Sequence, residues 1–178
     1  NLKEATLLDN LGLAVHVVEM ARSRPGDWAV IFGATPVGIL TTQVLQASGV
    51  SVVVADVVDA RLEVAQKITG AHIVNGRADD VRRLLGDLAD GRRADIAIVN
   101  LAVQIMLEQA FDVVRDGATI VTLGAFTRPV ELDLYHHITA REIALVGATG
   151  RTEETWRKTM QLVESGTVKL EPLIAMTL

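Results

Sequence analysis

The sequence predicts an α/β fold in which helices cover both faces of a doubly wound parallel sheet, with six strands in the order 3-2-1-4-5-6. Short apolar runs alternate along the chain with longer segments whose apolar residues recur at helical spacing. These runs are apolar throughout rather than at every second position, which is typical of parallel strands buried on both faces. With 178 residues, 49% of them hydrophobic, the chain can bury the core of one such domain.

Each element is predicted from its period and from the residues that bound it. The helical segments repeat apolar residues at spacings of three and four, and glycine follows two of them, at Gly70 and Gly117. The strand segments are short runs that end at Gly, Asp or Asn. In chain order we expect a helix over residues 5–22, a strand over 29–32, a helix opening at 36–38, a strand over 52–55, a helix over 59–68, a strand over 72–74, a helix over 79–89, a strand over 96–99, a helix around 107–114, a strand over 119–123, a short helix before a strand over 143–146, and a helix over 153–165.

The turn after the first predicted strand indicates a nucleotide site. Gly33 and Gly38 fit the outer glycines of G-x-G-x-x-G, and the free N–H groups of a helix that opens at Pro36 can hold a phosphate. Thr35 stands where the middle glycine belongs, and its β-branched side chain is expected to crowd a pyrophosphate. Asp56 ends the second predicted strand, where a carboxylate accepts the ribose hydroxyls of NAD and repels the 2′-phosphate of NADP.

The rest of the predicted site follows from topology, because a ligand lies across the carboxyl ends of strands one and four in such a sheet. Arg61 is expected beside the adenine or the ribose, with a solvated helix face as the alternative. The turn itself has an alternative too, an ordinary strand-to-helix connection without a ligand. The remaining predicted cofactor contacts are Val37, Asn100, Leu101, Leu123 and Gly124.

Composition limits the partners. The net charge of −5 provides no basic field for nucleic acid or an anionic membrane, so we expect small molecules or other protein chains instead. The absence of cysteine excludes disulfides, thiolate zinc sites and thiol nucleophiles. No apolar run is long enough to span a bilayer, and the expected location is the cytoplasm.

Taken together, the motifs resemble the cofactor-binding domain of the medium-chain dehydrogenase/reductase family, which includes the zinc-dependent alcohol and polyol dehydrogenases. The similarity covers nearly the whole chain, and the shared order of its motifs is what makes it specific. The motifs are Arg24-Pro-Gly-Asp27, Gly33-Ala-Thr-Pro-Val-Gly38, Ala55-Asp56, Arg61-Leu-Glu-Val-Ala65, Gly70-Ala-His-Ile-Val-Asn75, Leu107-Glu-Gln-Ala110, Arg115-Asp-Gly117, Leu123-Gly124, Val146-Gly147 and Gly166-Thr-Val-Lys-Leu-Glu-Pro-Leu-Ile174.

The resemblance implies that residues 1–178 are the dinucleotide-binding domain of an oxidoreductase that transfers hydride between a hydroxyl compound and NAD. It implies a GroES-like catalytic domain outside this chain, so we expect no catalytic residue here and no activity from this part alone. It also implies that Val37 and Leu13 pack against the nicotinamide ring. Zinc is possible in the full-length protein, with Asp9 at the position of one ligand; the alternative is an acidic residue that favours the start of a helix.

A homodimer is expected through the last predicted strand, Ile143-Ala-Leu-Val146, because it would form an apolar sheet edge and family members pair such edges. Three other functions remain open. One is a dinucleotide-sensing or structural module whose phosphate site Thr35 has weakened. Another is a methyltransferase, against which the helix opening at Pro36 argues. The zinc-free quinone and enoyl reductases are the third, and Asp56 disfavours their usual NADPH.

Overall fold

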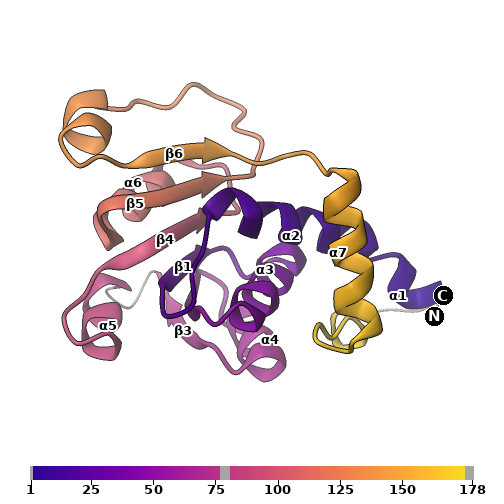
Figure 1. The fold of residues 1–178 in the computed structure, drawn as a ribbon. Coiled ribbons are helices and arrows are strands. Elements are labelled where there is room, and N and C mark those ends of the chain that lie inside the picture. The colour runs from indigo at the N-terminus through magenta and orange to yellow at the C-terminus, as the bar shows by residue number, and fades with distance from the viewer. Residues whose placement is uncertain (1, 77–80, 175–178) are drawn as a thin grey trace.

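The computed structural model describes residues 2–76 and 81–174. Its six strands are all parallel and form one sheet in the order β3-β2-β1-β4-β5-β6, which confirms the predicted topology (Figure 1). The strands are β1 Trp28–Phe32, β2 Ser51–Asp56, β3 His72–Asn75, β4 Ala94–Val99, β5 Val114–Thr122 and β6 Ala144–Gly147.

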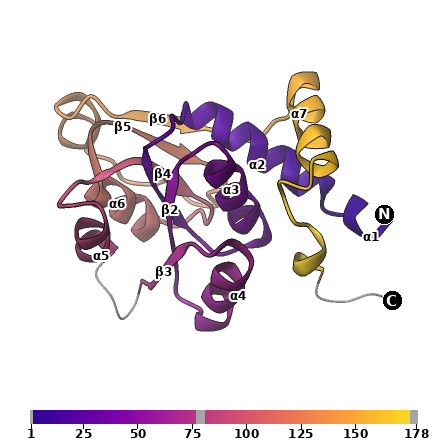
Figure 2. The same ribbon diagram turned by 60° about the horizontal axis from the view of Figure 1, so that its bottom comes forward.

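Helices cover both faces of this sheet. One face carries α2, α3 and α4, and the other carries α5 and α6, while α7 packs on the outer side of α2 (Figures 1 and 2). The α-helices are α1 Leu2–Ala5, α2 Leu8–Ala21, α3 Pro36–Ala47, α4 Asp59–Thr69, α5 Val81–Leu88, α6 Gln104–Val113 and α7 Glu153–Glu164. A π-helical turn η1 spans Tyr135–Thr139, and a 3-10 turn η2 spans Glu171–Leu173.

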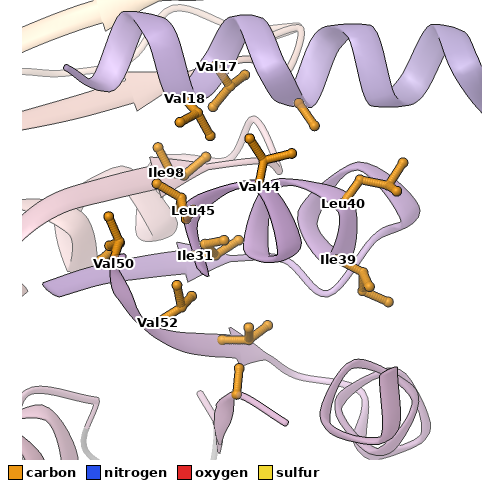
Figure 3. Close-up of a cluster of buried hydrophobic side chains, with 14 of the residues drawn as sticks. Val17, Val18, Ile31, Ile39, Leu40, Val44, Leu45, Val50, Val52 and Ile98 are labelled. Atoms are coloured by element: carbon orange, nitrogen blue, oxygen red, sulfur yellow. The ribbon is translucent and has the colours of Figure 1, made fainter. Parts of the chain in front are cut away.

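The core beneath α3 fixes this helix against the strand that precedes it. Ile31 of β1 is fully buried among Leu40 and Leu45 of α3, and Val18 of α2 closes the cluster from above (Figure 3). Burying each such side chain contributes about 1.5–3 kcal/mol. The β1–α3 connection is therefore held between two packed elements, and its backbone has little freedom to move.

The alternating faces of β1 explain why the run is apolar throughout. Val30 and Phe32 point to the opposite face from Ile31 and join a second cluster that includes Leu85 of α5 and Phe111 of α6. Both faces of the strand are buried, as a parallel sheet requires.

The predicted start of the fifth strand is wrong. The fifth strand begins at Val114, before the expected Asp116-Gly117 turn, which lies inside β5 as an irregularity in the pairing with β4. Gly117 has a φ of +71°, a conformation that glycine adopts without strain. Ala94 of β4 pairs with Val114 of β5, and the next pair is Ile96 with Thr119, so the register shifts between them. The residues of β5 between these two pairs stay in the sheet because the strand is paired with β4 before and after them.

The expected edge strand also needs correction. Ile143 precedes β6 and is only 4% exposed, because its side chain joins the core on the α5–α6 face. The exposed apolar residues of the edge are Ala144 and Leu145, with Leu145 39% exposed. Ile143 therefore anchors the strand and takes no part in the exposed edge.

The expected first helix is divided, since residues 2–5 and 8–21 form separate helices joined by a turn. Asp79 and Asp80, the first residues of the helix predicted over 79–89, lie outside the described residues. In the part that is described, no helix has the length and apolar character to cross a membrane.

Candidate functional site

The glycine turn lies between the carboxyl end of β1 and the first residue of α3. Gly33 has a φ of +110°, which explains why the sequence needs glycine there. Gly38 is required by close packing, because a Cβ on it would lie 2.1 Å from the Gly33 carbonyl oxygen. Both glycines thus serve the roles expected of the outer glycines in the motif.

Thr35 is the N-cap of α3. Its φ of −76° is open to any residue, and its Oγ1 accepts a hydrogen bond from the Gly38 N–H at 3.1 Å. Pro36 follows at the first helical position, where its missing N–H costs nothing. Among the described residues, nothing accepts a hydrogen bond from the Val37 N–H, so this donor is available at the positive end of the helix.

Asp56 is more deeply involved in the turn than the sequence indicates. Its side chain is fully buried, and Oδ2 accepts a hydrogen bond from the Ala34 N–H at 2.8 Å. Oδ1 accepts from the N–H groups of Val57 and Val58 at 2.7 and 2.9 Å. A carboxylate has about four lone-pair positions, so the donors among the described residues leave one for a further donor. Among the described residues, the cation paired with it is Arg61, whose side chain is half-exposed and has Nη1 4.0 Å from Oδ2.

The opposite rim of the turn comes from the ends of β4 and β5. Asn100 Nδ2 donates to the Gly33 carbonyl oxygen at 3.2 Å, and the same Gly33 would bring a Cβ within 3.2 Å of Leu101 Cγ. Gly124 is packed as tightly, because its Cβ would lie 2.7 Å from the Ala102 nitrogen. Leu123 is half-buried beside the core on the α3 face. The structure therefore brings the predicted residues of three strand ends around one turn.

Asp9 lies in the first turn of α2 and is paired with a residue from the far end of the chain. Arg151 Nη2 lies 2.7 Å from Asp9 Oδ2, and Nε and Nη2 also donate to the Asp9 carbonyl oxygen at 3.1 and 2.9 Å. The Arg151 side chain also lies against α2 at Gly12, where a Cβ would be in ordinary van der Waals contact with it at 3.6 Å. The sequence gives no signal for this pair, because local spacing says nothing about contacts between distant segments.

Asp9 and the side chains around it do not fit a zinc site. The Asp9 carboxylate already faces a guanidinium, and a second cation there would be repelled by it. Within residues 2–76 and 81–174, no three His, Cys, Asp or Glu side chains are grouped as a metal site would need. The metal role of Asp9 stays a prediction.

A cavity of about 570 Å³ lies away from the turn, where α2, α3 and α7 approach their C-terminal ends. Val15, Val44 and Leu162 line its apolar part, and Glu19 and Lys158 form an ion pair of 2.7 Å at its side. None of the predicted cofactor contacts lines this cavity.

Comparison with known proteins gives the family. The model of the zinc-binding dehydrogenase family matches residues 36–165, from the first residue of α3 to the end of α7. The chain belongs to the zinc-binding dehydrogenase family. Two curated relatives are similar to this zinc-binding dehydrogenase chain over almost all of its length. An L-threonine 3-dehydrogenase of Pyrococcus horikoshii is 33% identical over 96% of this chain and 49% of its own length. A probable D-xylulose reductase A of Emericella nidulans is 30% identical over 98% of this chain and 50% of its own.

Solved structures share the fold of this zinc-binding dehydrogenase chain. A protein described as a short chain alcohol dehydrogenase of Escherichia coli CFT073, complexed with NADH, superposes with a TM-score of 0.84 at 23% identity, over 94% of this chain and 49% of its own. The 2R,3R-butanediol dehydrogenase of Bacillus subtilis gives a TM-score of 0.85 at 22% identity, over 94% and 48%. At these identities the likeness concerns the fold. The chain spans about half the length of the curated relatives it matches.

Proposed function

We propose that this chain is the NAD-binding domain of a zinc-binding dehydrogenase, and that a GroES-like catalytic domain lies outside the 178 residues. The observation that carries the proposal is the Gly33–Gly38 turn, closed by Asp56 from β2 and by Asn100 from β4. NAD supplies the hydride acceptor when it is bound. This chain binds and orients the dinucleotide.

The pyrophosphate lies against the first turn of α3 in this proposal. The Val37 N–H is available there, and the helix dipole adds positive potential at the same end. Thr35 uses its hydroxyl to cap the helix, so the crowding expected at this position is limited to its methyl group. Pro36 is exposed beside it, and Gly38 lets the helix approach Gly33 closely.

The adenosine ribose is assigned to the end of β2. One of its hydroxyls donates to a lone pair of Asp56 that no described residue occupies, which requires the side chains around this buried carboxylate, Arg61 among them, to make room. A 2′-phosphate would bring a second anion against this buried carboxylate, which is why NAD is preferred to NADP. Leu101, Leu123 and Gly124 form the other wall, toward the nicotinamide half.

The whole protein is proposed to oxidise or reduce a small hydroxyl compound. The support is that the curated relatives are named as dehydrogenases or reductases of threonine and xylulose. A homodimer through β6 is proposed as well, because β6 ends the sheet and Leu145 on it is partly exposed. The cytoplasmic location stays a prediction from composition.

Calorimetric titration of the chain with NADH and NADPH tests the cofactor proposal. We expect NADH to bind and NADPH to bind at least about tenfold more weakly, because the phosphate meets Asp56. Equal affinity for the two would remove the ribose assignment. Absence of binding would favour the module with a weakened phosphate site, and Thr35→Gly would then show whether the threonine is the cause.

Sedimentation tests the dimer separately. A dimer at micromolar concentration is expected, and Leu145→Lys should shift it toward monomer by placing a charge on the paired edge. A wild-type monomer at that concentration would overturn this part of the proposal.

A further inference from the structure

One peptide group in the turn, the unit between Gly33 and Ala34, is held at both ends. Its carbonyl oxygen accepts a hydrogen bond from Asn100 Nδ2 at 3.2 Å, and its N–H donates to Asp56 Oδ2 at 2.8 Å. The two side chains come from β4 and β2, which flank β1 on either side. The orientation of the peptide plane is therefore set by the neighbouring strands of the sheet as well as by the local conformation.

Asn100 is packed so closely that its amide has little choice of position. A Cβ on Gly38 would lie 2.6 Å from Asn100 Nδ2, and one on Gly33 would lie 3.1 Å from Asn100 Cβ. The backbone is fixed too, because the Asn100 N–H donates to the Phe32 carbonyl at 3.0 Å and the Asn100 carbonyl faces Gly124. Asn100 thus lies with its side-chain amide against the turn and its backbone carbonyl against Gly124, which follows β5.

The nitrogen and the oxygen of the Asn100 side-chain amide differ in their hydrogen bonding. Nδ2 has its acceptor, whereas Oδ1 is buried and has no hydrogen-bond partner within residues 2–76 and 81–174. A buried acceptor without a donor lowers the stability of the folded chain, so Oδ1 is not the reason for an asparagine at this position. Reversing the amide would set Oδ1 against the Gly33 carbonyl oxygen, which two acceptors do not tolerate. The contribution of Asn100 is one donor aimed at one carbonyl.

We propose that Asn100 is a positioning residue, which fixes the Gly33–Ala34 peptide plane and thereby presents the first turn of α3 to the phosphates of the dinucleotide. This inference rests on the proposed function, since it concerns the same site. Asn100 acts on cofactor binding by holding the turn in place, and it need not contact the cofactor itself.

An isosteric exchange isolates the donor. In Asn100→Asp a carboxylate faces the Gly33 carbonyl and repels it, whereas the protonated acid regains an O–H that can donate to it. Burial and the lack of a partner favour the protonated form of this aspartic acid. The variant should therefore recover as the pH falls. Asn100→Ala has no donor at any pH, and Gln66→Glu adds the same charge at an exposed position of α4.

Calorimetric titration with NAD at about pH 8 and about pH 5 separates the outcomes. At the higher pH we expect Asn100→Asp to bind about ten- to a hundredfold more weakly than wild type, and at the lower pH to regain most of that loss. Asn100→Ala should stay weak at both, and Gln66→Glu should follow wild type. Wild-type affinity of Asn100→Ala at both pH values would overturn the inference, because this variant has no donor for the Gly33 carbonyl oxygen.

Failure of the proposed function is recognised by a wild-type chain that binds NAD at neither pH. The positioning role is then decided on the ligand-free chain, by amide hydrogen exchange at Ala34, whose N–H belongs to the clamped peptide. At neutral pH we expect about tenfold faster exchange in Asn100→Asp than in Gln66→Glu, because losing one anchor frees the plane. Equal exchange rates would contradict the role.

Discussion

Asp56 is predicted to be a stability determinant as well as a cofactor contact. Asp56→Ala removes the acceptors of three backbone N–H groups, those of Ala34, Val57 and Val58, at a side chain that is fully buried. Hydrogen bonds to a charged acceptor contribute about 1.5–3 kcal/mol each, and the three share one carboxylate, so their loss is not additive. We expect the free energy of unfolding to fall by about 4 kcal/mol.

Asp56→Asn divides this effect between the two oxygens. The amide oxygen can still accept from Val57 and Val58, but the NH2 group then meets the Ala34 N–H, and two donors face each other. We expect the free energy of unfolding to fall by about 2 kcal/mol. Half of the Asp56→Ala effect would then belong to the hydrogen bond from the Ala34 N–H, which links the turn to β2.

Urea unfolding and thermal unfolding followed by circular dichroism measure both variants. For a chain of this length about 4 kcal/mol corresponds to a decrease in Tm of roughly 10 °C. Asp112→Ala is the matched control, because this carboxylate is exposed on α6 and makes no side-chain hydrogen bond among the described residues. It should change stability by no more than about 0.5 kcal/mol. A loss below about 1 kcal/mol for Asp56→Ala would refute the reasoning.

Three further predictions concern local geometry. Gly38→Ala should cost more than about 3 kcal/mol in urea unfolding, because its Cβ would lie 2.1 Å from the Gly33 carbonyl oxygen; near-wild-type stability would mean that the turn adapts freely. Thr35→Ala should cost about 1 kcal/mol through loss of the N-cap, and Thr35→Ser should restore most of it, whereas equal losses would assign the effect to the methyl group. Hydrogen bonds from His136 lower the pKa of Asp133 below its ordinary value of 3.8. The stability that these bonds give the folded chain is therefore present above pH 3.8 and is lost as the pH falls through the lower pKa of the folded state. An NMR titration of Asp133 with a midpoint at or above 3.8 would contradict this.

The fold was predictable because its signals are local. The apolar run at 29–32 and the glycines at 33 and 38 follow from backbone requirements that neighbouring residues reveal, and the carboxylate at 56 is recognised by its place at the end of the next strand. Strand order follows from topology rules once the alternation of strands and helices is recognised. The errors arose where tertiary pairing extended or shifted an element, as with β5, whose pairing with β4 continues past the glycine turn at 117.

The kind of site can be predicted from local sequence, because G-x-x-x-x-G after a buried strand and an acid after the next one restrict the possible ligands. The way its polar groups are shared could be seen only once the segments were placed in space. Asp56 and Asn100 meet one peptide group from opposite sides, and Asp9 pairs with Arg151 across 142 positions of sequence. Such contacts depend on which segments the sheet and the packed helices bring together, and the period of a segment carries no information about its distant partners.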